Sequence, residues 1–114
     1  MLNSGKLVWG WDDGTTGNST TTISTGQWFQ FVVVLDNYYA TYYYNGTLDK
    51  SQSQNTDLAS SPNNSWSIGR QNRDFSGEFY YLNCDVSIAR QYNRLLTDME
   101  ILQNFNAQRS RFGL

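Results

Sequence analysis

The chain has 114 residues, which suffice for one hydrophobic core, so we expect a single domain over residues 1–114. Charged residues make up only 16% of it and the net charge is −2, whereas soluble domains carry about 25% charged residues. The 8 basic residues are spread along the sequence, and no run approaches the roughly 20 apolar residues of a membrane span. We therefore expect neither a nucleic acid nor a membrane as a partner.

The first half of the chain alternates β-branched or aromatic runs with turn residues, which predicts short antiparallel strands. We expect strands over residues 7–9 and 20–24. Residues 28–35 place apolar side chains on both faces, which predicts a central strand covered on both sides. A turn at Asp36-Asn37 leads to a Tyr-rich strand over residues 38–44. Asn45-Gly46 then closes a hairpin, since this pair tolerates positive φ at both positions.

The second half begins with a polar stretch over residues 49–65, which predicts a long surface loop. Short strands are expected over residues 66–68 and 79–82. Val86, Ile88 and Tyr92 alternate with polar residues and predict one more strand. Thr97 and Glu100 have the spacing of a capping box, in which each side chain bonds the other's backbone N–H. They predict a helix over residues 98–106.

Three segments, in this order, resemble the laminin-G-like branch of the concanavalin A-like lectin and glucanase superfamily. They are Gly26-Gln27-Trp28 ahead of an apolar strand, Tyr43-Tyr44-Asn45-Gly46, and Tyr92-Asn93-Arg94-Leu95-Leu96-Thr97 ahead of the capped helix. The resemblance implies an all-β fold: an antiparallel β-sandwich, or jelly roll, with one short C-terminal helix. It corresponds only to the later part of that fold, so the sandwich is expected to be truncated at its N-terminus.

Residues 100–106 and 111–114 look like the ends of such domains in structural proteins of tailed bacteriophages. This resemblance implies a non-catalytic structural or decoration protein of a virion, assembled in the host cytoplasm. Its partners would be other virion proteins or copies of itself. A free, extracellular carbohydrate-binding lectin module and a fragment of a longer adhesin are the alternatives, because this superfamily hosts many functions.

Enzymes of the glucanase branch use two carboxylates that face each other across the scissile bond. The only glutamates, Glu78 and Glu100, lack the closely spaced acidic motif of those enzymes, and the capping box already accounts for Glu100. We therefore expect no enzymatic activity. Asp12-Asp13-Gly14 and Asp36-Asn37 could supply calcium ligands, but Asp and Asn also favour turns through their own backbone hydrogen bonds. No cofactor is expected.

Two groups of side chains are candidates for binding. Aromatic rings can stack on sugars, and the expected glycan contacts are Trp11, Tyr39, Tyr43 and Trp66. Contacts with partner proteins are expected near both ends of the chain, where apolar anchors stand beside arginines, a combination common in protein interfaces. These residues are Trp9, Arg109, Arg111, Phe112 and Leu114. Because the strand over residues 28–35 needs cover on two faces, we expect a homo-oligomer or a bound subunit.

Overall fold

The computed structural model describes residues 2–3, 5–10, 16–53, 68–73 and 78–114. In this part of the chain, short strands are followed by one α-helix and one 3-10 helix, η1. The strands are β1 (Leu2–Asn3), β2 (Lys6–Gly10), β3 (Thr16–Thr22), β4 (Phe31–Asp36), β5 (Tyr39–Tyr44), β6 (Thr47–Ser53), β7 (Arg70–Arg73) and β8 (Glu78–Tyr81). The helices are α1 (Asp98–Asn106) and η1 (Arg109–Phe112). This is the predicted all-β architecture with a short C-terminal helix.

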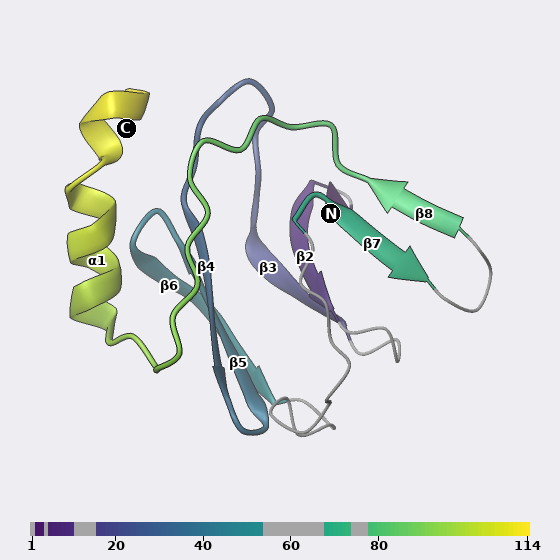
Figure 1. Ribbon diagram of the computed structural model, residues 1–114, viewed down its shortest axis with the longest axis horizontal. Helices are drawn as coiled ribbons and strands as arrows, with labels where there is room; N and C mark the ends of the chain where they lie inside the picture. The colour runs from purple at the N-terminus through teal and green to yellow at the C-terminus, as the bar shows by residue number, and fades with distance from the viewer. Residues whose placement is uncertain (1, 4, 11–15, 54–67, 74–77) are drawn as a thin grey trace.

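The strands form three antiparallel sheets, with strand orders β1-β2-β3, β4-β5-β6 and β7-β8. Figure 1 shows α1 on one side of the β4–β6 sheet and the β1–β3 sheet on the other side. The β4–β6 sheet is thus the middle layer, and both of its faces contribute to the core. Among the residues whose burial the structure describes, the buried apolar side chains are Leu7, Ile23, Ala40, Tyr42, Tyr43 and Ile101.

The middle sheet is a meander whose two turns are set by the local sequence. Asp36 pairs with Tyr39 across the first turn, where Asn37 has a φ of 46°. Tyr44 pairs with Thr47 across the second, where Asn45 and Gly46 have φ values of 48° and 76°. Positive φ at both central residues is the type I′ geometry that matches strand twist. The predicted Asn45-Gly46 hairpin is confirmed.

The prediction that residues 28–35 form a central strand is wrong. The strand begins only at Phe31, and β4 is an edge strand of its sheet within the described residues, with its apolar residues half-buried. The centre is β5, because a tight hairpin on each side places β4 and β6 at its two edges. The polar segment predicted as a loop from residue 49 is also different, since β6 continues to Ser53. Residues 54–65 of that predicted loop lie outside the described residues.

The strand predicted from Val86, Ile88 and Tyr92 is also absent. Residues 82–97 form neither strand nor helix, and Figure 1 shows them as a long trace from β8 to α1. Alternation of apolar and polar residues favours an extended chain, but a strand also requires a neighbour to bond with. The strands predicted over residues 7–9, 20–24, 38–44 and 79–82 correspond to β2, β3, β5 and β8. Of the strand predicted over residues 66–68, residues 66–67 lie outside the described part, and residue 68 is not in a strand.

Candidate functional site

The N-terminus of α1 is fixed by a capping box extended with an ion pair. Thr97 N–H donates to Glu100 Oε2 at 2.9 Å, and Glu100 N–H donates to Thr97 Oγ1 at 3.3 Å. The Arg94 guanidinium donates to both carboxylate oxygens of Glu100, at 2.9 and 2.7 Å. The predicted capping box is confirmed, and Arg94 is a member that the pattern did not predict.

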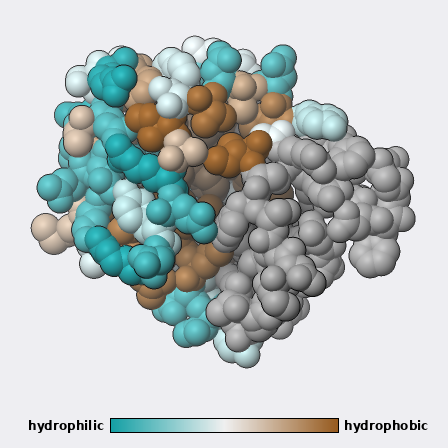
Figure 2. All heavy atoms as spheres, in the orientation of Figure 1, coloured by the Kyte–Doolittle hydropathy of each residue, from teal (hydrophilic) through white to brown (hydrophobic). Residues whose placement is uncertain are grey.

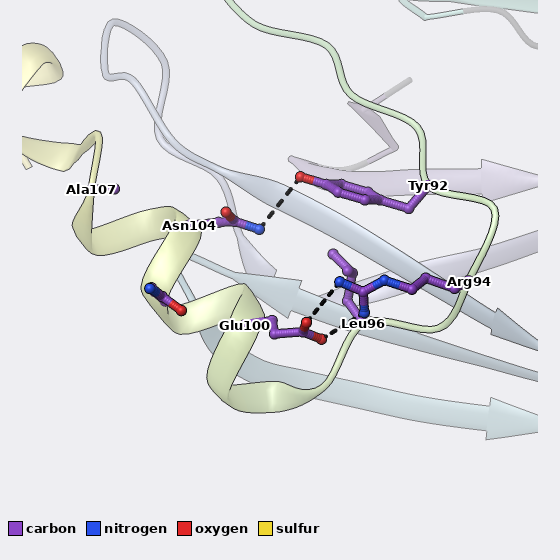
Figure 3. Close-up of a pocket in the computed structure, with 7 residues that line it drawn as sticks. Tyr92, Arg94, Leu96, Glu100, Asn104 and Ala107 are labelled. Carbon is purple, nitrogen blue, oxygen red and sulfur yellow. Dashed lines mark hydrogen bonds and ion pairs between the residues drawn. The ribbon is translucent and has the colours of Figure 1, made fainter.

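A hollow of about 270 Å³ lies between this cap, the first two turns of α1 and the segment that leads into the helix (Figure 3). Tyr92 and Asn104 meet across it, with Asn104 Nδ2 3.5 Å from the Tyr92 hydroxyl. The lining residues are Tyr92, Arg94, Leu96, Glu100, Gln103, Asn104 and Ala107. The two charged side chains that line the hollow, Arg94 and Glu100, are already paired with each other.

Electrostatics in the hollow follow from the ion pair. Hydrogen bonding from Arg94, with further bonds from Thr97, lowers the pKa of Glu100 to about 2. The same hydrogen bond raises the pKa of Arg94. A carboxyl with so low a pKa is ionised at neutral pH and has no proton to donate as a general acid. The role of Glu100 in this geometry is to stabilise the N-terminus of α1.

An exposed apolar strip precedes the helix, and we define it as Val86, Ile88, Tyr92 and Leu95. Val86 is 53% exposed and Ile88 37% exposed. Figure 2 shows hydrophobic side chains gathered in the upper middle of the viewed face, which the trace after β8 crosses in Figure 1. Large apolar side chains that are exposed together mark interaction surfaces more often than scattered ones do.

Of the four predicted glycan contacts, two lie outside the described residues: Trp11 and Trp66. Tyr39 is 57% exposed at the start of β5, so its ring is open to solvent. Tyr43 is only 6% exposed, and its hydroxyl donates to Asp98 Oδ1 at 2.6 Å. The prediction of Tyr43 as a stacking residue is wrong, because the ring is buried in the core and its hydroxyl bonds the first turn of α1.

The predicted partner contacts at the C-terminus belong to η1 and the residues that follow it. Phe112 packs on Trp28 with a ring-centroid distance of 5.1 Å, and the Arg111 guanidinium carbon lies 5.8 Å from the Phe112 ring centre. Phe112 is therefore half-buried, and its ring contacts Trp28 of the same chain. Arg109, Arg111 and Leu114 are exposed. Trp9 lies in β2, where it pairs with Gly17 of β3.

The turns proposed as calcium ligands give no assembled site in the described part of the chain. Asp12, Asp13 and Gly14 are outside it. Asp36 accepts a hydrogen bond from the Asn37 side chain at 3.1 Å, which is the local turn interaction. Among described residues, no three His, Cys, Asp or Glu side chains gather where they could hold a metal ion.

No helix in the described part of the chain has the length and apolar character needed to cross a membrane.

Sequence reasoning missed Asp49, which joins two sheets. Its carboxylate accepts from Thr20 N–H at 2.6 Å, from Thr21 N–H at 2.8 Å and from the Thr21 hydroxyl at 2.5 Å. Burial raises the pKa of Asp49, but these hydrogen bonds outweigh it and leave the pKa below its ordinary value. No local pattern marks this residue, because its partners on β3 are distant in sequence.

Comparison with known proteins identifies the family of this chain. A family model for the Concanavalin A-like lectin/glucanases superfamily matches residues 1–102. The chain matches no curated protein. It is similar to the crystal structure of residues 221–444 of an S-layer domain-containing protein from Clostridium thermocellum ATCC 27405, with 20% identity and a TM-score of 0.57. The similarity covers 79% of this chain and 44% of that one. At this identity the likeness carries the fold alone.

Proposed function

We propose that this chain, which belongs to the Concanavalin A-like lectin/glucanases superfamily, is a non-catalytic adhesive module that assembles with other proteins in a virion. The observation that carries this proposal is the apolar strip. Its four side chains, Val86, Ile88, Tyr92 and Leu95, are exposed along one continuous stretch of chain. Burial of such side chains against another protein would be favourable at roughly 25 cal/mol for each Å² of apolar surface.

The virion setting rests on the resemblance of residues 100–106 and 111–114 to the ends of domains in phage structural proteins. In this role the protein decorates or builds the particle, with other virion proteins or its own copies as partners. Its location would be the assembled virion.

A direct test is to purify particles from infected host cells on a density gradient and to quantify this chain by mass spectrometry. A structural or decoration protein is expected to co-purify at a fixed copy number per particle after salt washes. In a matched experiment, the Val86→Lys, Ile88→Lys double variant of the chain is expected to be lost from the particles. The Met99→Lys variant, whose substitution lies on the exposed surface of α1, is expected to stay on them. A chain found only in the soluble fraction would contradict the proposal.

A free lectin module is the second candidate, and the exposure of Tyr39 favours it. Tyr38 and Tyr39 are both exposed at the turn that joins β4 to β5, where two rings could present faces to a sugar. Binding on a glycan array by the soluble chain, abolished by Tyr39→Ala with unchanged unfolding, would support this candidate. Unaltered binding by the Tyr39→Ala variant would exclude Tyr39 as a glycan contact.

A further inference from the structure

The turn between β5 and β6 contains an asparagine side chain that can react with its own backbone. Gly46 follows Asn45 directly, and glycine has no Cβ to shield its nitrogen from the Asn45 side chain. In this reaction the Gly46 nitrogen gives up its proton to a base and attacks Asn45 Cγ. A C–N bond closes a succinimide ring, and the side-chain nitrogen leaves as ammonia. Water then opens the ring to give aspartate or isoaspartate.

The folded turn restrains the asparagine in this reaction. Asn45 N–H donates to Gln30 O at 2.9 Å, and Gln30 N–H donates to Asn45 Oδ1 at 2.8 Å. Asn45 also has the positive φ of a type I′ turn, at 48°. Ring closure brings Asn45 Cγ to the Gly46 nitrogen, which requires Asn45 to leave both this backbone conformation and its side-chain bond to Gln30.

The helix α1 covers the second reacting group. Gly46 is buried, and a Cβ built on it would lie 3.0 Å from Phe105 Cβ and 3.1 Å from Leu102 Cδ1. Removal of the Gly46 N–H proton needs contact with a base in solution, so, like hydrogen exchange, it needs a local opening of the fold. Since Phe105 and Leu102 both belong to α1, this opening requires α1 to move away from the turn.

From this geometry we propose that Asn45 is a site of deamidation and isomerisation that α1 protects while it is docked. The two products differ in whether the turn can form again. Aspartate keeps a side-chain oxygen that can accept the bond from Gln30 N–H. Isoaspartate carries an additional main-chain carbon into the turn, where Phe105 and Leu102 leave no room for it. A chain that isomerises while α1 is undocked therefore does not dock it again.

Peptide mapping by mass spectrometry tests the site and its protection. At mildly alkaline pH, Asn45 is expected to deamidate at least about tenfold more slowly in the folded chain than in urea, which corresponds to about 1.4 kcal/mol of opening free energy. Asn37 is the internal control, since Tyr38, which follows it, has a Cβ. Equal rates at Asn37 and Asn45 in urea would refute the site. Equal rates at Asn45 in buffer and in urea would refute the protection.

A pair of variants tests the role of α1. Tyr43→Phe removes the hydrogen bond to Asp98 that ties β5 to α1, and it is expected to speed deamidation of folded Asn45 by about fivefold, which corresponds to about 1 kcal/mol. Asp49→Asn is the matched control, because it weakens bonds to β3 and leaves the contacts of α1 in place. Equal acceleration in both variants, or none in Tyr43→Phe, would show that undocking of α1 does not control the reaction.

Refolding tests the fate of the products. The isoaspartate form, separated by chromatography after incubation in urea, is expected to refold with less helix content and a lower urea midpoint than the natural chain. The Asn45→Asp variant, which represents the other product, is expected to match the natural chain in both measurements. An isoaspartate form with an unchanged midpoint would contradict the irreversible step.

Discussion

The hydroxyl of Tyr43 is a single group that ties the middle sheet to the helix. It donates to Asp98 at 2.6 Å from a residue that is almost fully buried. We expect Tyr43→Phe to lower the free energy of unfolding by about 1 kcal/mol, because it removes one hydrogen bond without opening a cavity. Urea unfolding followed by circular dichroism measures the loss. Tyr39→Phe is the control, since Tyr39 is exposed, and an equal loss there would contradict the assignment.

The same hydroxyl makes stability depend on alkaline pH. Burial, aided by the hydrogen bond to Asp98, raises the pKa of Tyr43 from 10.0 to about 12. The folded state thus holds this proton more tightly than the unfolded state. Its contribution is full below pH 10 and is lost as pH rises from 10 to about 12. A titration of stability should show a shallower decline in Tyr43→Phe than in the natural chain. Parallel declines in the two proteins would refute this attribution.

Gly46 is required by its conformation and by its position under the helix. It has a φ of 76°, and a Cβ there would lie 3.0 Å from Phe105 Cβ and 3.1 Å from Leu102 Cδ1. Gly26 has the same φ of 76° with nothing within 4 Å of a Cβ. We expect Gly26→Ala to cost about 1 kcal/mol for backbone strain, and Gly46→Ala at least about 1 kcal/mol more for crowding. Equal losses in thermal or urea unfolding would show that α1 does not press on this turn.

At the scale of the element, α1 depends on its capping box. Thr97→Ala removes the side-chain acceptor for Glu100 N–H and should lower stability by about 1 kcal/mol. Met99→Ala, at an 82% exposed position in the first turn of the same helix, should have little effect. Helix content and urea midpoint measure both variants. A loss in Met99→Ala as large as in Thr97→Ala would mean that the cap is not what holds the helix start.

Elements whose signals are local were predictable, and those that depend on neighbours were not. The Asn45-Gly46 turn and the Thr97–Glu100 cap each arise from residues that lie within four positions on the chain, and both occur as predicted. The apolar faces of residues 31–35 indicated a strand but not its place in the sheet. Val86 and Ile88 indicated an extended chain, yet no ladder forms there, because pairing requires a second strand that local pattern does not supply.

At the scale of the whole molecule, Asp49 fastens the middle sheet to the β1–β3 sheet. We expect Asp49→Asn to lower stability by at least about 1 kcal/mol, because hydrogen bonds to a charged acceptor are stronger than those to a neutral amide.

The pKa of Asp49 in the folded state lies below the unfolded value of about 3.9. The stability that its carboxylate contributes is therefore present above pH 4 and fades as pH falls further. Acid unfolding should therefore separate the two proteins less at pH 2 than at pH 6. A gap that is constant with pH would count against this role. Asp36→Asn, at an exposed turn, is the control.

The same scale explains which predicted binding residues changed role. Tyr43 has an ordinary strand pattern around it, and only the docking of α1, which brings Asp98 to its hydroxyl, makes it a buried structural residue. Phe112 likewise becomes internal because Trp28 lies beside it. Contacts between residues far apart on the chain decide exposure, and a single sequence does not specify them. Tyr39 and Arg111 kept the exposure that their predicted roles require.

The contact between Trp28 and Phe112 also has a kinetic consequence. It joins two positions that enclose most of the chain, so forming it early would require closing a very long loop. The β4–β5–β6 meander, in contrast, needs only two tight turns. We expect the meander to form first in refolding and the C-terminal helices to dock late. In stopped-flow refolding, Phe112→Ala should then accelerate unfolding far more than it slows folding, whereas a substitution at the Asn45-Gly46 turn should mainly slow folding. The reverse pattern would show that Trp28 and Phe112 meet before the meander forms.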